Sequence, residues 1–117
     1  MNRSNGMIFN IFVKKENELF VAHCMELDIV ATGQSIEEAS QDLIDLIIAQ
    51  LRYAFGNNNL DHLYRPAPAE VWREFYMCKE LLEEKEIRLP AEEGPQQSFM
   101  PPWIITKMCR PETEWHV

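Results

Sequence analysis

The stretch that decides the fold runs from Leu19 to Phe55 and reads LFVAHCMELDIVATGQSIEEASQDLIDLIIAQLRYAF. Its first part contains two strand-like runs: Leu19–Met25 is largely apolar, and Ile29–Thr32 is β-branched or small. A polar Glu-Leu-Asp turn separates the two runs, and Gly33 follows the second. The last part has the residue spacing of one long amphipathic helix. Together these elements predict an α+β fold in which a helix covers a small sheet.

The helix has a clear start signal. Ser35 followed by Glu38 is the capping-box pattern, in which the serine hydroxyl accepts a hydrogen bond from a first-turn amide and the glutamate carboxylate reaches back. We therefore expect the helix to begin at Ile36 and to end where Gly56 and three asparagines tolerate positive φ. Apolar residues recur along it at three- and four-residue steps, namely Ile36, Ala39, Leu43, Ile47, Leu51 and Ala54.

The residues before this stretch predict another strand. Between Met7 and Lys14 every odd position is apolar, which is typical of a strand with one buried face. A short charged connection follows, and its Asn17 tolerates positive φ, so a hairpin into Leu19–Met25 is expected. With Ile29–Thr32 these segments predict a three-stranded antiparallel meander.

The second half of the chain is less regular. Leu60–Ala67 has the composition of a loop, and the spacing of apolar residues predicts a second helix near Ala69 to Glu86. Pro90–Ser98 is a polar stretch with proline and glycine that predicts an exposed loop. Trp103–Met108 reads as a last strand. We therefore expect one domain over residues 1–117, with a core at 7–55 and 103–108 and a helix-and-loop insertion at 60–98.

Length, charge and cysteine content narrow the function classes. A chain of 117 residues that is 46% apolar can bury the core of a single domain. Eleven basic and nineteen acidic residues give a net charge of -8, which disfavours binding to nucleic acids. The three cysteines, Cys24, Cys78 and Cys109, are widely spaced, so we expect reduced thiols and a cytoplasmic location. No segment reads as a signal peptide or membrane span.

The residues Phe20–Ala39, FVAHCMELDIVATGQSIEEA, resemble the N-terminal domain of HicB-family antitoxins and their uncharacterised orphan relatives. In that family a strand ends in a Cys/Pro-x-Glu-Leu type of turn, and a short strand, a glycine and a Ser/Thr-x-Glu-Glu-Ala helix start follow. The resemblance extends over roughly Ile8 to Phe55. It implies a partial RNase H-like fold, in which a helix crosses three antiparallel strands and a fourth strand returns parallel to the first.

The resemblance also implies a function. Members of the family are homo-oligomers, and those paired with a toxin bind and cover a small basic ribonuclease. Many carry a C-terminal DNA-binding motif, but Leu60–Val117 shows neither a helix-turn-helix nor a ribbon-helix-helix pattern. Our first hypothesis is a non-catalytic protein-interaction module that forms a dimer or higher oligomer and neutralises a small basic toxin, without a metal or cofactor. The negative charge of the chain would complement such a partner.

Two other hypotheses stay open. A small carboxylate-dependent hydrolase or nuclease would need acidic side chains that converge on a metal, one of them from the first strand, where Asn10 stands. His23 and Cys24 could form a metal or nucleophile site with Glu26 and Asp28, but adjacent strand residues point to opposite faces. A buried cysteine and a histidine on the strand surface is the simpler interpretation. A DNA-binding regulator of the antitoxin type is the third hypothesis, and the net charge disfavours it.

Four aromatic residues are candidate protein-interaction residues: Trp72, Tyr76, Trp103 and Trp115. The first two share the predicted second helix, where they fit a core or subunit contact better than a base-stacking platform, which also needs a cationic groove. Trp103 follows Pro101-Pro102, and Trp115 lies in the C-terminal tail. Both could anchor a partner or simply pack within the fold.

Overall fold

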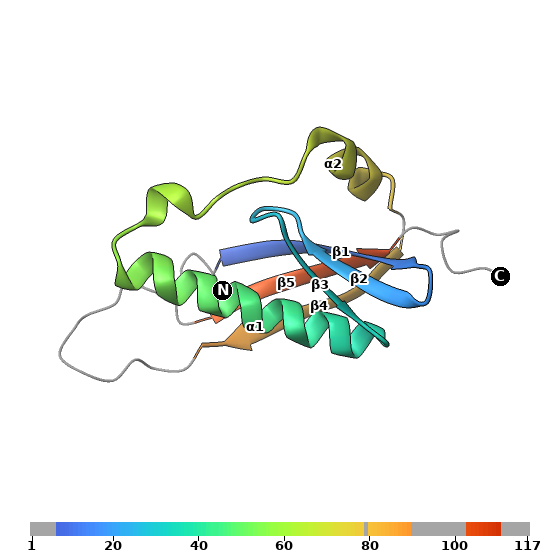
Figure 1. The fold of residues 1–117 in the computed structure, drawn as a ribbon, viewed down its shortest axis with the longest axis horizontal. Coiled ribbons are helices and arrows are strands. Elements are labelled where there is room, and N and C mark those ends of the chain that lie inside the picture. The colour runs from blue at the N-terminus through green and yellow to red at the C-terminus, as the bar shows by residue number, and fades with distance from the viewer. Residues whose placement is uncertain (1–6, 79, 90–102, 111–117) are drawn as a thin grey trace, which may run out of the picture.

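The first predicted strand lies at the centre of a five-stranded mixed sheet in this computed structural model of an α+β protein (Figure 1). The structure describes residues 7–78, 80–89 and 103–110. Strands and helices follow in the order β1 (Met7–Glu16), β2 (Leu19–Cys24), β3 (Ile29–Gly33), α1 (Ile36–Gly56), a 3-10 turn η1 (Leu60–His62), α2 (Ala69–Tyr76), β4 (Glu80–Arg88) and β5 (Trp103–Arg110). The strand order in the sheet is β3-β2-β1-β5-β4.

Strand β1 is paired on both sides. It runs antiparallel to β2 through a hairpin in which Asn17 has a φ of 58°. On its other side it runs parallel to β5, from Met7 opposite Ile104 to Phe12 opposite Cys109. Side chains on both faces of β1 are fully buried, with Phe9 on one face and Phe12 on the other. The alternation predicted one buried face, and the second face is buried because α2 packs against it.

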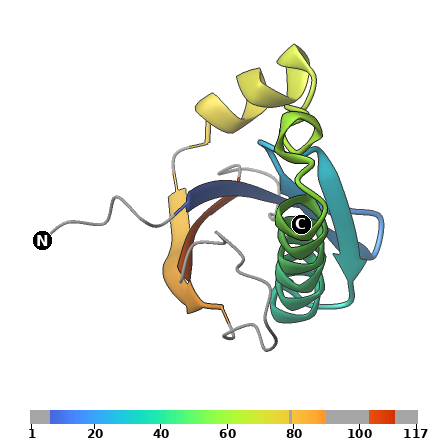
Figure 2. The same cartoon turned by 90° about the vertical axis from the view of Figure 1, so that its left-hand side faces the viewer.

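Helix α1 lies on the concave face of the sheet (Figure 2). The predicted capping box is formed: the Glu38 amide donates to Ser35 Oγ at 3.0 Å, and Glu38 Oε1 accepts from the Gln34 amide at 2.7 Å. Gly33 lets the helix begin this close to β3, since a Cβ there would lie 2.7 Å from the Ala39 nitrogen. The apolar stripe forms the main core with the sheet, and its buried members are Ala39, Leu43, Ile47, Leu51 and Ala54.

Helix α2 covers part of the opposite face. There the buried residues Phe12, Met25 and Ala67 form a second, smaller cluster. Half-buried apolar side chains from α2 and the residue after its C-cap pack against it, namely Val71, Trp72, Phe75 and Cys78. The two clusters differ in size, so α1 is the better buried of the two helices.

The predicted helix from Ala69 to Glu86 is wrong in its second half. Helix α2 ends at Tyr76, and Glu80–Arg88 is strand β4, which pairs antiparallel with β5. The residues expected in the second half of the helix are therefore part of an edge strand, and residues 83–86 are exposed. Glutamate, leucine and lysine favour helix locally, but pairing with β5 overrides that preference. The last strand, expected as the fourth, is the fifth, and the predicted loop Pro90–Ser98 lies outside the described residues.

The expectation of three reduced cysteines is also wrong. Cys78 and Cys109 form a disulfide with a Cα–Cα distance of 6.3 Å across a sequence separation of 31 residues. Cys24 is a free thiol in the core. The spacing carried no signal because it is the distant pairing of β5 with β1 that brings the end of β5 next to the end of α2.

The core under α1 gives a stability test with a matched control. Ile47 is fully buried, whereas its neighbour Leu46 is 43% exposed. We expect Ile47→Ala to lower the free energy of unfolding by about 2–5 kcal/mol, since the lost contacts leave a cavity. Leu46→Ala should change it by less than about 0.5 kcal/mol. Urea unfolding followed by circular dichroism measures both, and equal losses would contradict the placement of α1.

The disulfide should stabilise the fold by restricting the unfolded chain. For the observed separation of 31 residues, the loop-entropy relation gives about 3–4 kcal/mol at 25 °C. We expect the double variant Cys78→Ser/Cys109→Ser to unfold at a lower urea concentration by that free energy and to remain folded in buffer. An unchanged midpoint, with the disulfide verified by mass in the unmodified protein, would contradict this expectation.

Candidate functional site

The clearest candidate for a binding surface is an exposed apolar group on α2. Tyr76 and Met77 are 74% and 75% exposed at the end of the helix, and the half-buried Trp72 precedes Tyr76 by about one turn. The ring centroids of Trp72 and Tyr76 are 5.7 Å apart. We call the surface formed by Trp72, Tyr76 and Met77 the α2 patch. Aromatic and methionine side chains of this kind are enriched at the centres of protein interfaces.

Contacts on the inner side of α2 hold the patch against the sheet. The Phe75 ring meets the Phe12 ring edge to face, with centroids 6.0 Å apart, and meets Trp72 at 5.9 Å. Lys14 Nζ lies 3.6 Å from Glu74 Oε1. Before the helix, the Ala67 amide donates to the Met25 carbonyl at 2.8 Å. The patch is therefore presented on a helix whose position the sheet defines.

The two other candidate aromatic residues do not join the patch. Trp103 begins β5 and is half-buried, and the Arg88 guanidinium lies 5.5 Å from its ring centroid. Six residues of strand, about 20 Å, separate Trp103 from Cys109 near α2. Trp115 lies outside the described residues. The sequence brought out Trp72 and Tyr76 by their helical spacing but gave no signal for Met77, because its exposure depends on where α2 ends.

Asn10 has a structural role, because it binds the turn between β2 and β3. The Asn10 amide donates to Glu26 Oε1 at 2.9 Å, and its Nδ2 donates to Glu26 Oε2 at 2.6 Å. Asn10 stands on the first strand, where an RNase H-type nuclease would need a carboxylate. In this chain the asparagine instead ties the turn to the central strand.

His23 is buried, at 9% exposure, and not on the strand surface as expected. It lies between the neighbouring strands, opposite Phe12 of β1 and Val30 of β3. Its Nε2 is 2.6 Å from Oδ1 of Asp28, a residue in the left-handed region with a φ of 55°. The pair joins β2 to the turn that follows it. The prediction failed because the sequence indicated neither the buried Phe12 opposite His23 nor the contact of its imidazole with Asp28.

Cys24 points into the core on the face opposite His23, as expected for adjacent strand residues, and is fully buried. Burial raises the pKa of the Cys24 thiol from 9.0 to about 12, and the nearby Glu26 charge adds to the effect. The thiol therefore stays protonated at neutral pH. A protonated thiol in the core is a poor nucleophile.

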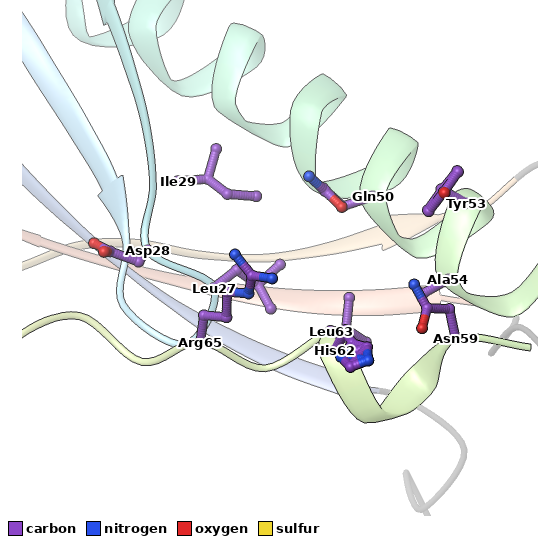
Figure 3. A pocket seen from close by; sticks show the side chains of 10 residues that line it. All are labelled: Leu27, Asp28, Ile29, Gln50, Tyr53, Ala54, Asn59, His62, Leu63 and Arg65. Carbon is purple, nitrogen blue, oxygen red and sulfur yellow. The ribbon is translucent and has the colours of Figure 1, made fainter.

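A groove of about 400 Å³ lies between the β2–β3 turn, the second half of α1 and the segment around η1 (Figure 3). Leu27, Ala54 and Leu63 contribute apolar side chains, and Gln50, His62 and Arg65 contribute polar ones. Among the described residues, Asp28 is the one carboxylate that lines it. Within that same part of the chain, no three acidic, histidine or cysteine side chains gather as metal ligands would. The groove offers hydrogen bonds to a small polar ligand.

No family model, curated protein or solved structure matches the chain. The resemblance to HicB antitoxins stays a prediction carried by Phe20–Ala39. In the described part of the chain, no helix has the length and apolar character needed to cross a membrane.

Thiol labelling tests the state of all three cysteines. With a maleimide at pH 7 and no reductant, we expect no labelling of the native protein and one label per chain after unfolding. Reduction before unfolding should give three labels. Since the folded pKa of Cys24 is about 12 and its ordinary value is 9.0, the free energy of unfolding should also fall as pH rises between these values. Rapid labelling of the native chain would contradict the burial of Cys24.

Proposed function

We propose that this protein is a non-catalytic, HicB-like interaction module that binds a small basic protein through the α2 patch. The observation that carries the proposal is the α2 patch itself, in which Tyr76 and Met77 are each about three-quarters exposed at the end of α2 and the Tyr76 ring lies 5.7 Å from the Trp72 ring. Large apolar side chains presented in a fixed geometry bind with little loss of conformational entropy. Clustered exposed apolar side chains are a feature of surfaces that partners cover.

The arrangement of strands supports the HicB-like part of the proposal. Strands β1, β2 and β3 form an antiparallel meander, and β5 lies parallel to β1. Helix α1 crosses this sheet on one face. These are the relationships that the partial RNase H-like fold implies. Strand β4, which extends the sheet beyond β5, is an addition to that pattern.

Charge supports a basic partner. The chain has a net charge of -8, and several of its acidic side chains lie on the exposed sides of two elements. Helix α1 exposes Glu37, Glu38, Asp42 and Asp45, and the edge strand β4 exposes Glu83, Glu84 and Glu86. An acidic field of this kind raises the rate at which a cationic protein associates and orients its approach. The proposed partner is a basic ribonuclease toxin, which an antitoxin of this type would cover.

The contacts of the candidate catalytic residues favour a binding role for the protein. Asn10 binds Glu26, His23 binds Asp28, and Cys24 is buried with a raised pKa. Each group thus has a structural role in the turn or the core. We propose further that the chain acts in the cytoplasm and assembles as a dimer or higher oligomer, for which β3 and β4 are the edge strands of the described sheet.

The test pairs two exposed positions with a matched control. We expect Tyr76→Ala/Met77→Ser to weaken binding to the short basic protein encoded in the adjacent reading frame by about tenfold or more, the effect of losing interface hot spots. Tyr53→Ala removes a tyrosine that is 61% exposed on α1 and should leave the affinity unchanged. Isothermal titration calorimetry across a salt series measures both, and added salt should weaken binding.

Three outcomes would contradict the proposal. The first is an adjacent reading frame that encodes no short basic protein, which removes the antitoxin assignment. The second is equal affinity for the double variant and the unmodified chain. The third is a change of oligomeric state in the double variant without any binding of the basic protein, which would make the α2 patch a contact between copies of this chain.

A further inference from the structure

We propose that the Cys78–Cys109 disulfide is a thiol switch that controls whether the α2 patch is presented. The inference rests on the proposed function for its biological meaning, but its structural part concerns α2 alone. Cys78 directly follows Met77 of the patch, and Cys109 lies near the end of β5. The bond therefore joins the end of the helix that presents the patch to the sheet beneath it.

Helix α2 has little stability of its own. It contains eight residues, and helices of this length are marginal in water. None of its residues is fully buried, and its N-cap, Pro68, makes no side-chain capping hydrogen bond. The ion pair between Lys14 and Glu74 involves a glutamate that is 57% exposed, so it contributes little. The helix thus depends on the small apolar cluster and on the disulfide.

The disulfide and the apolar cluster are coupled through the sheet. Cys109 lies opposite Phe12 in the parallel pairing of β5 with β1. Phe12 is also the ring that Phe75 of α2 contacts. The covalent bond and the principal aromatic contact therefore meet at one place on the sheet. Opening the bond removes the covalent restraint at the position where α2 is held.

The other thiol of the chain does not interfere with such a switch. Cys24 is fully buried and protonated at neutral pH, whereas Cys78 and Cys109 are each partly exposed. Disulfide exchange needs a thiolate that can reach the bond. Cys24 meets neither condition, so reduction and reoxidation are confined to one pair of sulfur atoms and return to the same bond.

The reaction requires an external dithiol of the thioredoxin type or two molecules of a monothiol. A thiolate of the reductant attacks one sulfur of the Cys78–Cys109 bond and forms a mixed disulfide with it. The other cysteine leaves as a thiolate. A second reductant thiolate then attacks the mixed disulfide and releases the remaining cysteine. The chain gains two electrons and two protons as two thiols, and the reductant leaves as its own disulfide. A disulfide oxidant reverses both steps.

Reduction weakens binding by lowering the fraction of molecules in which α2 is ordered. A partner that needs the ordered helix has an apparent dissociation constant that rises as that fraction falls. In a reducing compartment a smaller fraction of molecules would then have α2 ordered, and reoxidation of the disulfide would restore that fraction. Persistent disulfides are rare in the reducing cytoplasm, where those that form are usually transient and regulatory.

The experiment compares the full chain in its oxidised and reduced forms by hydrogen exchange with mass spectrometry. We expect reduction with dithiothreitol to speed amide exchange of residues 71–76 by about tenfold or more, since local opening of α2 becomes easier, and to leave the α1 amides near Leu43 unchanged. Residues 71–76 of the Cys78→Ser/Cys109→Ser variant should exchange at the rate of the reduced form, and the reductant should not change that rate. The unmodified chain in defined glutathione mixtures gives the same readout if that variant does not fold.

A second readout separates the switch from the proposed function. Titration of the basic protein from the adjacent reading frame should show about tenfold weaker binding to the reduced chain, in line with the lower ordered fraction. Unchanged exchange of residues 71–76 on reduction overturns the switch, whether or not the partner binds. Faster exchange with unaltered affinity supports the switch but removes the α2 patch as the docking site.

Discussion

The parallel pairing of β1 with β5 is the constraint on which the rest of the structure depends. Strand β1 carries large apolar side chains on both faces, Phe9 on one and Phe12 on the other, so it is stable only between two other strands. Strand β2 follows it directly, but its other neighbour comes from near the end of the chain. This closure gives β4 a partner and brings Cys109 next to Cys78.

The two faces of the sheet differ in how firmly they hold their helices. On the concave face α1 inserts a long apolar stripe into the main core, and on the other face α2 rests on the small cluster around Phe12 and Met25. Segments with few buried contacts open locally at lower free energy than the core does. The exposed side chains of the α2 patch therefore belong to the element that a covalent bond can most readily fix or release.

The sequence predicts what local signals determine. Ser35 and Glu38 mark the start of α1, the alternation from Met7 marks β1, and the step from Trp72 to Tyr76 places both rings on one side of α2. It does not predict what distant pairing determines. Residues 80–88 consist largely of helix formers and become a strand only because β5 offers an edge. The disulfide and the exposure of Met77 depend on the same closure, so no local spacing could reveal them.

The polar residues of β1, β2 and the β2–β3 turn bond to one another. Glu26 accepts two hydrogen bonds from Asn10, and Asp28 lies within hydrogen-bonding distance of His23. Removing either carboxylate would leave Asn10 or the buried His23 without this hydrogen-bonding partner, which costs stability. The same bonds fix the β2–β3 turn, and α1 begins after the strand that follows this turn. These polar groups thus stabilise the scaffold, whereas the interaction that we propose uses exposed side chains at the end of α2.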